Sequence, residues 1–299
     1  MSSSSPIIRR LSLEGPFDLA RTAAFSFGPK AREAFDGTYR MAFCVDGYQT
    51  SAAVAITQPS PEQLSVEIAG DAVDPDVVVR QVARILSVDV DSRGWVTLAE
   101  QDEVLAPLVA AAPGLRPPLF SSAYEALAWS VLSARRPRAQ MTKVRDELAR
   151  AAGVGLTVAG EQLWAFPLPE AMLTVSEFPG LNGQKLERLH GVAAAAAAGG
   201  LDTAALRGMP VGQAEASALQ LDGIGPFYAQ LLTVRTLGHT DLLPSGEAKL
   251  LAVLGARLGR DEPVSQAEFA VLAERWRPWR TWASVHLRAV DLPAERIDV

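Results

Sequence analysis

The residues with the clearest chemical potential form a short glycine-containing string between two helical stretches. Residues 221–229 read LDGIGPFYA, with Gly223 and Gly225 two positions apart and Ile224 between them. Glycines at this spacing allow a tight turn whose backbone amides converge, while Ile224 fills the apolar seam between the helices. Such amides, at the start of a helix, attract a phosphate oxygen without any side chain. The string predicts a helix-hairpin-helix, and we assign nucleic-acid backbone binding to Gly223, Ile224, Gly225 and Ala229.

Two groups of basic residues offer charge for the same purpose. The first comprises Arg135, Arg136, Arg138, Lys143 and Arg145, and the second comprises Arg275, Arg277 and Arg280. The formal net charge of −6 argues against a broadly basic protein, but a local basic face is enough to bind a short stretch of DNA. The alternative for each group is a solvated helix face.

Composition excludes several other classes of site. A single cysteine, Cys44, rules out an internal disulfide framework, a four-cysteine iron–sulfur cluster and a zinc ribbon. The three histidines, His190, His239 and His286, are far apart in sequence and are expected to pack rather than to bind metal. We therefore expect no metal and no cofactor, apart from a possible monovalent cation at the hairpin backbone.

The first part of the chain, residues 1–112, predicts a mixed α+β unit. Residues 16–25 and 74–86 have helical patterns, and four runs alternate like strands: IIRRLSLEG, TYRMAFCVDG, TSAAVAITQ and QLSVEIAG. Residues 112–118, APGLRPP, have the proline and glycine density of a linker. Residues 1–6 form a serine run without the basic and apolar regions of a signal peptide, so we expect a cytoplasmic protein.

The second part, residues 113–299, predicts an all-helical domain, because the apolar period changes to between three and four. The helix-hairpin-helix occupies about residues 214–237 of it. Trp276, Trp279 and Trp282 are three apart, and such a stripe indicates packing more than base stacking. The expected helices span 123–132, 138–152, 170–175, 183–199, 214–219, 226–237, 249–258, 265–276 and 279–290.

Several segments together resemble the helix-hairpin-helix DNA glycosylases, and within them the DNA-3-methyladenine glycosylase II type. Beside the hairpin, AERWRPWRTWASVHL (273–287) is similar to the terminal helix segment of that family. APGLRPPLFSSAYEALAWSVLSAR (112–135) and GLNGQKLERL (180–189) are similar to two further family helices. The α+β unit matches the family's extra domain in position and size. The resemblance covers nearly the whole chain and identifies it as a divergent member.

The resemblance implies a catalytic carboxylate on the loop after the hairpin, at about residues 238–248. The family spacing of arginine, aspartate and catalytic aspartate falls on Arg235, Asp241 and Glu247, so a glutamate stands where the family has aspartate. A carboxylate in a poorly hydrated site stabilises the positive charge that builds on deoxyribose as an N-glycosidic bond breaks. An alternative alignment, pinned on the loop proline, places Ser245 or Gly246 there. A purely structural acid at a helix start is the other alternative.

The resemblance also implies roles for residues around the carboxylate. Bifunctional relatives carry a lysine at the position of Phe227, so this chain is expected to be monofunctional; Phe227 either faces the extruded base or packs in the core. Leu231 and Arg288 occupy positions where alkylpurine enzymes have aromatic residues. The apolar wedge of the family is replaced by Arg135, for which phosphate binding beside Arg136 is equally open.

The sequence thus predicts a monofunctional glycosylase that flips a damaged base, an alkylated purine by resemblance, and hydrolyses its N-glycosidic bond. The expected partner is double-stranded DNA, with no membrane association and no stable oligomer. We expect a bacterial-type, nucleoid-associated protein. The alternative is a catalytically impaired homologue that binds lesions or distorted DNA.

Overall fold

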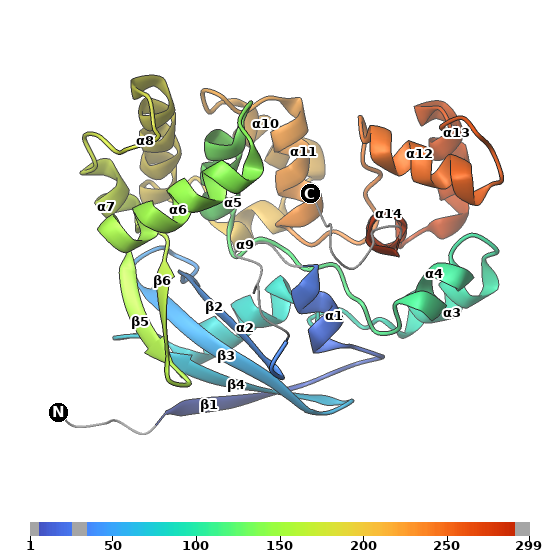
Figure 1. Ribbon diagram of the computed structural model, residues 1–299, viewed down its shortest axis with the longest axis horizontal. Coiled ribbons are helices and arrows are strands. Elements are labelled where there is room, and N and C mark those ends of the chain that lie inside the picture. Colours follow the sequence, from blue (N-terminus) through green and yellow to red (C-terminus); the bar gives the residue numbers. More distant parts are fainter. Residues whose placement is uncertain (1–5, 26–34, 291–299) are drawn as a thin grey trace.

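A computed structural model describes residues 6–25 and 35–290; residues 1–5 of the serine run lie outside them. The described chain is α+β, as the sequence predicted, and its helices and strands form three groups (Figure 1). No helix in this part of the chain is long and apolar enough to cross a membrane.

The first group is an antiparallel sheet of strand order β1-β4-β3-β2. Its strands are β1 (Ile7–Ser12), β2 (Thr38–Cys44), β3 (Ser51–Ser60) and β4 (Gln63–Ala69). Strand β3 is buried on both faces, because Val54 and Ile56 face one side while Ala53 and Ala55 face the other. The large side chains pack against α2 (Pro75–Ile85), and the alanines let a second, smaller sheet approach closely.

Helix α2 begins and packs as its sequence dictates. Asp74 accepts a hydrogen bond from the Asp76 amide at 2.9 Å, and Pro75 occupies the first turn. Val78 and Val82, four residues apart, are buried on the face that meets the sheet. The short helix α1 (Leu19–Ala24) precedes β2 and ends at the buried ring of Phe25.

The second group contains the helices that surround the hairpin. They are α5 (Ala123–Ser133), α6 (Arg138–Ala152), α7 (Pro169–Leu173), α8 (Gly183–Ala197), α9 (Thr203–Gly208), α10 (Val211–Leu219) and α11 (Pro226–Arg235). Their shared core includes Leu127, Leu189, Ile224 and Leu232. The predicted hairpin residue Ile224 is thus part of the main core of this group.

The third group joins two helices that precede residue 112 to the last helices of the described chain. It contains α3 (Arg93–Gln101), α4 (Ala106–Ala111), α12 (Ala248–Arg257), α13 (Gln266–Ala273), the 3₁₀ turn η1 (Glu274–Trp276) and α14 (Arg280–Val290). Trp276, Trp279 and Trp282 are buried in its core, where Trp279 and Trp282 contact the Trp95 ring and Trp276 contacts the Phe269 ring. Helices α3 and α4 precede residue 112 yet share this core, so the division of the chain at 112 remains a prediction.

The region after residue 113 is not all-helical, contrary to the sequence prediction. Strands β5 (Val154–Val158) and β6 (Glu161–Ala165) form an antiparallel hairpin that packs on the alanine face of the sheet. Its two-residue turn has Ala159 and Gly160 at φ +47° and +77°, a geometry that matches the twist of paired strands. The turn lacks the usual Asn-Gly sequence, and strands this short give little periodicity.

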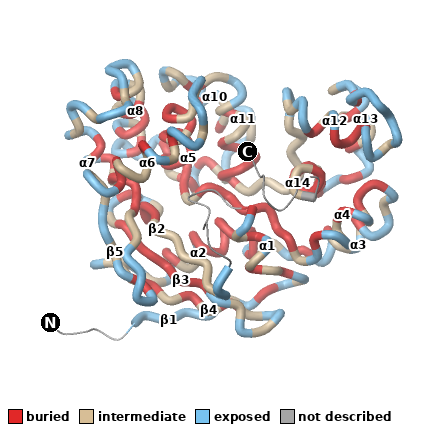
Figure 2. Tube along the Cα trace, in the orientation of Figure 1, coloured by how far each residue is buried: buried red, intermediate tan, exposed pale blue. Residues whose placement is uncertain are grey.

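The predicted linker is a buried segment held by one arginine. The side chain of Arg116 is fully buried and donates to the carbonyl oxygens of Glu14, Gly15, Pro16, Ser87 and Val90. Residues 115–120 are buried where the groups meet (Figure 2). The prolines here shape a rigid connection rather than a flexible one.

His286 makes the third core sensitive to acid. It is buried in α14, contacts the Trp95 ring and bonds to the Trp282 carbonyl, and burial lowers its pKa from 6.5 to about 4. Stability from the neutral ring is complete above the unfolded pKa of 6.5 and is lost as the pH falls toward 4, by roughly 3 kcal/mol.

We therefore expect His286→Gln to be less stable than wild type at pH 7 and to lose most of that difference by pH 4. Urea unfolding of both proteins across this range measures it. A difference in free energy of unfolding that is constant with pH would contradict the assignment.

Candidate nucleic-acid interface and base cavity

The hairpin between α10 and α11 has the backbone geometry that its glycines predict. Gly223 has φ +85°, and Gly225 is extended and precedes Pro226 at the start of α11. No side chain caps this helix start, and a Cβ on Gly225 would meet no atom of the described chain within 4 Å. No side chain therefore caps the start of α11, but two of the four amides assigned to phosphate binding are used within the protein, since Ile224 donates to the Leu221 carbonyl and Ala229 to the Gly225 carbonyl. Ala229 is buried one turn further and bonds back to Gly225.

The turn between α5 and α6 presents the predicted wedge. Arg135 is exposed at the turn with φ +55°, a conformation that costs energy for a residue with a side chain. Arg136 is exposed beside it. The structure thus presents both side chains on the surface of a tight turn.

Helix α8 supports both of these elements, which the sequence did not reveal. Lys185 donates from Nζ to the carbonyl oxygens of Val131 (2.8 Å), Leu132 and Ala134 (3.2 Å) at the end of α5. Arg188, three residues on, pairs with Asp222 of the hairpin at 3.0 Å. The two side chains share a face of α8, so one rigid helix sets the wedge turn and the hairpin relative to each other.

A cavity of about 70 Å³ opens between α11, α12 and α14. Four predicted site residues line it together: Phe227, Leu231, Glu247 and Arg288. Phe227 is 53% exposed and packs edge-to-face on Tyr228, so its ring is not part of the core. Phe25 from the end of α1 lies in the same wall, although no sequence pattern linked it to this site.

The Glu247 side chain faces this cavity. Glu247 occupies the cap position of α12, but its carboxylate makes no capping hydrogen bond there. Instead, Oε2 lies 3.5 Å from Arg288 Nη1, and the side chain of Arg288 is largely buried while that of Glu247 is half-buried. Ser245 and Gly246, the residues of the alternative alignment, are exposed and do not line the cavity.

The loop that carries Glu247 is anchored at several points. Asp241 accepts from Arg277 and Arg280 at 2.7 Å each, and the Ser245 amide donates to Gln230 of α11 at 2.8 Å. Arg277 and Arg280 therefore hold the loop against α14, and Arg275 pairs with Asp102 at the end of α3. This internal pairing offsets the charge that the group was predicted to offer to DNA.

Arg235 closes the back of the cavity. Its guanidinium is buried, donates to the Pro118 carbonyl at 3.0 Å and lies 5.3 Å from the centroid of the Phe25 ring. Burial lowers the pKa of Arg235 to about 9, so the side chain remains charged at neutral pH. The opposite charge of nearby Glu247 raises the pKa of Arg235 and so offsets part of the effect of burial.

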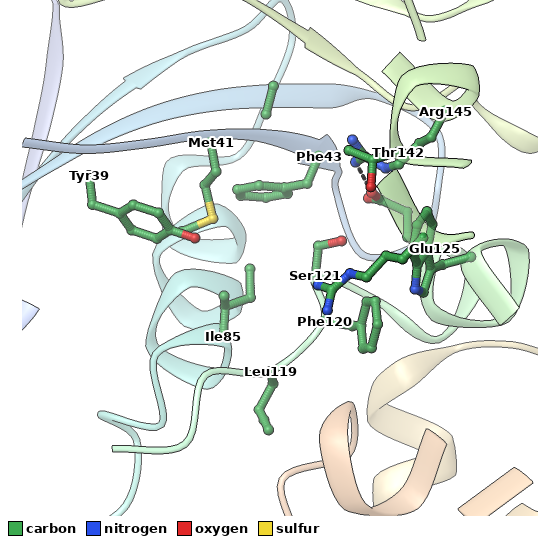
Figure 3. Close-up of a pocket in the computed structure, with 13 residues that line it drawn as sticks. Tyr39, Met41, Phe43, Ile85, Leu119, Phe120, Ser121, Glu125, Thr142 and Arg145 are labelled. Carbon is green, nitrogen blue, oxygen red and sulfur yellow. Dashed lines mark ion pairs between the residues drawn. The ribbon is translucent and has the colours of Figure 1, made fainter. Parts of the chain in front are cut away.

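A second cavity lies between β2, α5 and α6, and no sequence pattern indicated it (Figure 3). Its walls include Tyr39, Met41, Phe43, Phe120 and Trp129. At its edge, the buried carboxylate of Glu125 accepts from the Cys44 amide at 2.9 Å and lies 3.5 Å from Arg145. Burial raises the pKa of Glu125, and the pair joins the sheet to the helices that flank the wedge turn.

The hairpin geometry predicts that its two glycines differ in tolerance to substitution. Gly223→Ala places a Cβ at positive φ and 2.6 Å from Arg188 Cδ, whereas Gly225→Ala meets open space at negative φ. We expect Gly223→Ala to lower the free energy of unfolding by roughly 1–2 kcal/mol and Gly225→Ala by less than about 0.5 kcal/mol. Chemical denaturation of both variants without DNA tests this. Equal losses would contradict the hairpin conformation.

Within the described residues, no group of three or more potential ligands could hold a metal ion.

No family model matches the chain. A DNA-3-methyladenine glycosylase of Bacillus subtilis is 24% identical over 214 residues, which cover 70% of this chain and 71% of that protein.

A probable bifunctional transcriptional activator/DNA repair enzyme AlkA of Mycobacterium tuberculosis is 27% identical over 94% of this chain, but the chain spans about half of it, 55%. The structure of a 3-methyladenine DNA glycosylase from Archaeoglobus fulgidus superposes with a TM-score of 0.78 at 20% identity, covering 93% of this chain and 96% of that one. In its hairpin, its fold and its similarity to these proteins, the chain thus resembles the helix-hairpin-helix DNA glycosylases.

Proposed function

We propose that the chain is a monofunctional DNA glycosylase that extrudes a damaged base from duplex DNA and hydrolyses its N-glycosidic bond. The observation that carries the proposal is the position of Glu247, whose carboxylate caps no helix and faces a cavity lined by Phe227 and Arg288. The names of the similar proteins support DNA as the partner and an alkylated purine as the starting hypothesis for the substrate. The bacterial relatives are consistent with action at the nucleoid.

In this proposal each step of the reaction uses residues of the hairpin and the cavity. The hairpin amides hold the phosphate backbone, and the extruded base enters the cavity beside the Phe227 ring. Glu247 then stabilises the positive charge on deoxyribose as the bond to the base breaks, and it orients the attacking water. Lys249, two residues after Glu247, is exposed and does not line the cavity, and no other lysine lines it among the described residues. This supports hydrolysis without a Schiff base.

A binder that has lost catalysis is the second candidate. It is favoured by the ion pair itself, since Arg288 partly neutralises the carboxylate that the reaction needs. In this alternative the hairpin and the wedge turn recognise distorted DNA and leave the base intact.

Removal of the Glu247 carboxylate distinguishes the glycosylase from the inactive binder. We expect Glu247→Gln to lower the single-turnover rate of abasic-site formation by at least about 100-fold while duplex affinity is kept, because charge stabilisation of this kind is typically worth that much. Glu170→Gln, an exposed acid on α7, is the matched control. Excision by Glu247→Gln at the wild-type rate would remove Glu247 from the mechanism. Wild type that binds but excises no lesion would support the second candidate.

A second comparison tests Arg135, which we propose as the wedge. Unstacking a base step costs a few kcal/mol, so we expect Arg135→Ala to slow excision by at least about tenfold and to reduce the fluorescence of 2-aminopurine placed opposite the lesion. Arg136→Ala, beside it on the same turn, should weaken affinity for the duplex and make that affinity less dependent on salt concentration. Unchanged fluorescence in both variants would assign both arginines to phosphate binding, and an equal loss in both would contradict Arg135 as the single wedge.

A further inference from the structure

The side chain of Gln230 on α11 connects the wall of the base cavity to the loop that carries Glu247. Its Oε1 accepts hydrogen bonds from the Ser245 amide at 2.8 Å and from the Ser245 hydroxyl at 3.2 Å. A backbone amide can only donate, so the Gln230 side chain turns its oxygen, and not its nitrogen, toward the loop. The contact therefore fixes the orientation of this side chain as well as the position of the loop.

Gln230 shares a face of α11 with residues that form the wall of the cavity. Phe227 lies three residues before it and Leu231 one residue after it, and all three residues line the cavity. Residues three and four apart on a helix are neighbours on its surface. The helix that presents the Phe227 ring to the cavity thus also presents the acceptor that holds the loop.

On the loop, the held amide is close to the carboxylate. Gly246, at φ +72°, is the single residue between Ser245 and Glu247. Earlier in the loop, the Leu242 amide donates to the Thr281 hydroxyl of α14 at 2.8 Å, so that part is held by a different helix. Gln230 therefore anchors the end of the loop nearest the carboxylate, and it anchors that end to the helix of the cavity wall.

We infer that Gln230 is a positioning residue that sets the distance between the Glu247 carboxylate and a base held against Phe227, a role that rests on the proposed function. Glu247 stabilises charge on the sugar to which this base is attached, so its carboxylate has to be placed relative to the base. Displacement of a catalytic group by about 1 Å can cost about 100-fold in rate. Gln230 acts through the backbone of the loop, and Glu247 acts on the sugar.

A double-mutant cycle on a duplex with one ethenoadenine, an alkylated purine, tests this role. Gln230→Met keeps the length of the side chain but removes the acceptor, and we expect it to lower the single-turnover rate of base release by at least about fivefold with unchanged duplex affinity. In the Glu247→Gln background the same substitution should change the rate by less than about twofold, because the carboxylate that it displaces is already absent. Gln101→Met, at the exposed end of α3, is the matched control and should leave both rates unchanged.

A second measurement uses abasic analogues and needs no release of a base. A duplex with a cationic pyrrolidine in place of the damaged nucleoside mimics the charge on the sugar, whereas one with a tetrahydrofuran is neutral. We expect wild type to prefer the cationic duplex and Gln230→Met to lose at least about threefold of that preference, while Gln101→Met keeps it. The same preference in Gln230→Met and wild type would contradict a displaced carboxylate.

The outcomes of the cycle separate the role of Gln230 from the proposed function. Base release by Gln230→Met at the wild-type rate overturns the positioning role and leaves the glycosylase function intact. A loss that persists in full in the Glu247→Gln background shows that Gln230 acts independently of the carboxylate, and this also overturns the role. Failure of wild type to release the base or to prefer the cationic duplex, although it binds both duplexes, overturns the proposed function together with the inference.

Discussion

An ion pair between Glu247 at the start of α12 and Arg288 in α14 is the interaction on which the candidate site depends. A carboxylate at a helix start normally serves the helix by capping its amides. Here it does not, and the cationic partner on the neighbouring helix lies where it draws the side chain toward the cavity. Because Arg288 is largely buried and Glu247 is half-buried, moving either helix would separate a partly desolvated pair. The relative position of α12 and α14 is therefore constrained by the site itself.

The three groups of the fold each contribute one wall or support to that pair. The tryptophan core holds α14 against α3 and α12, and Asp241 ties the loop before Glu247 to Arg277 and Arg280. The hairpin group supplies α11 with Phe227, and α8 contacts both the turn after α5 and the hairpin, through Lys185 and Arg188. From the sheet group comes Phe25, held against the buried guanidinium of Arg235. The hairpin, the turn between α5 and α6 and the cavity are thus parts of one packed unit.

Sequence patterns predicted what depends on local chemistry. The hairpin could be recognised because glycine spacing and helix starts are local, and the helices of the second half followed from their period. The cavity residues Phe227, Leu231, Glu247 and Arg288 were named through a family resemblance, and the structure brings all four together. By contrast, the direction of the Glu247 side chain could not be read from the sequence, since an acid at a helix start is ordinary. The β5–β6 hairpin was missed because its strands are short and its turn lacks the usual residues. Phe25 and Lys185 act across long sequence distances, through tertiary contacts that no local pattern encodes.

The most direct test of the cavity as the site of an extruded base is a crystal structure of Glu247→Gln bound to a duplex with one ethenoadenine. We expect the base to lie in the cavity beside Phe227, with a phosphate on the amides near Gly225. A base that stays stacked in the duplex, or that is bound in another cavity, would contradict this assignment.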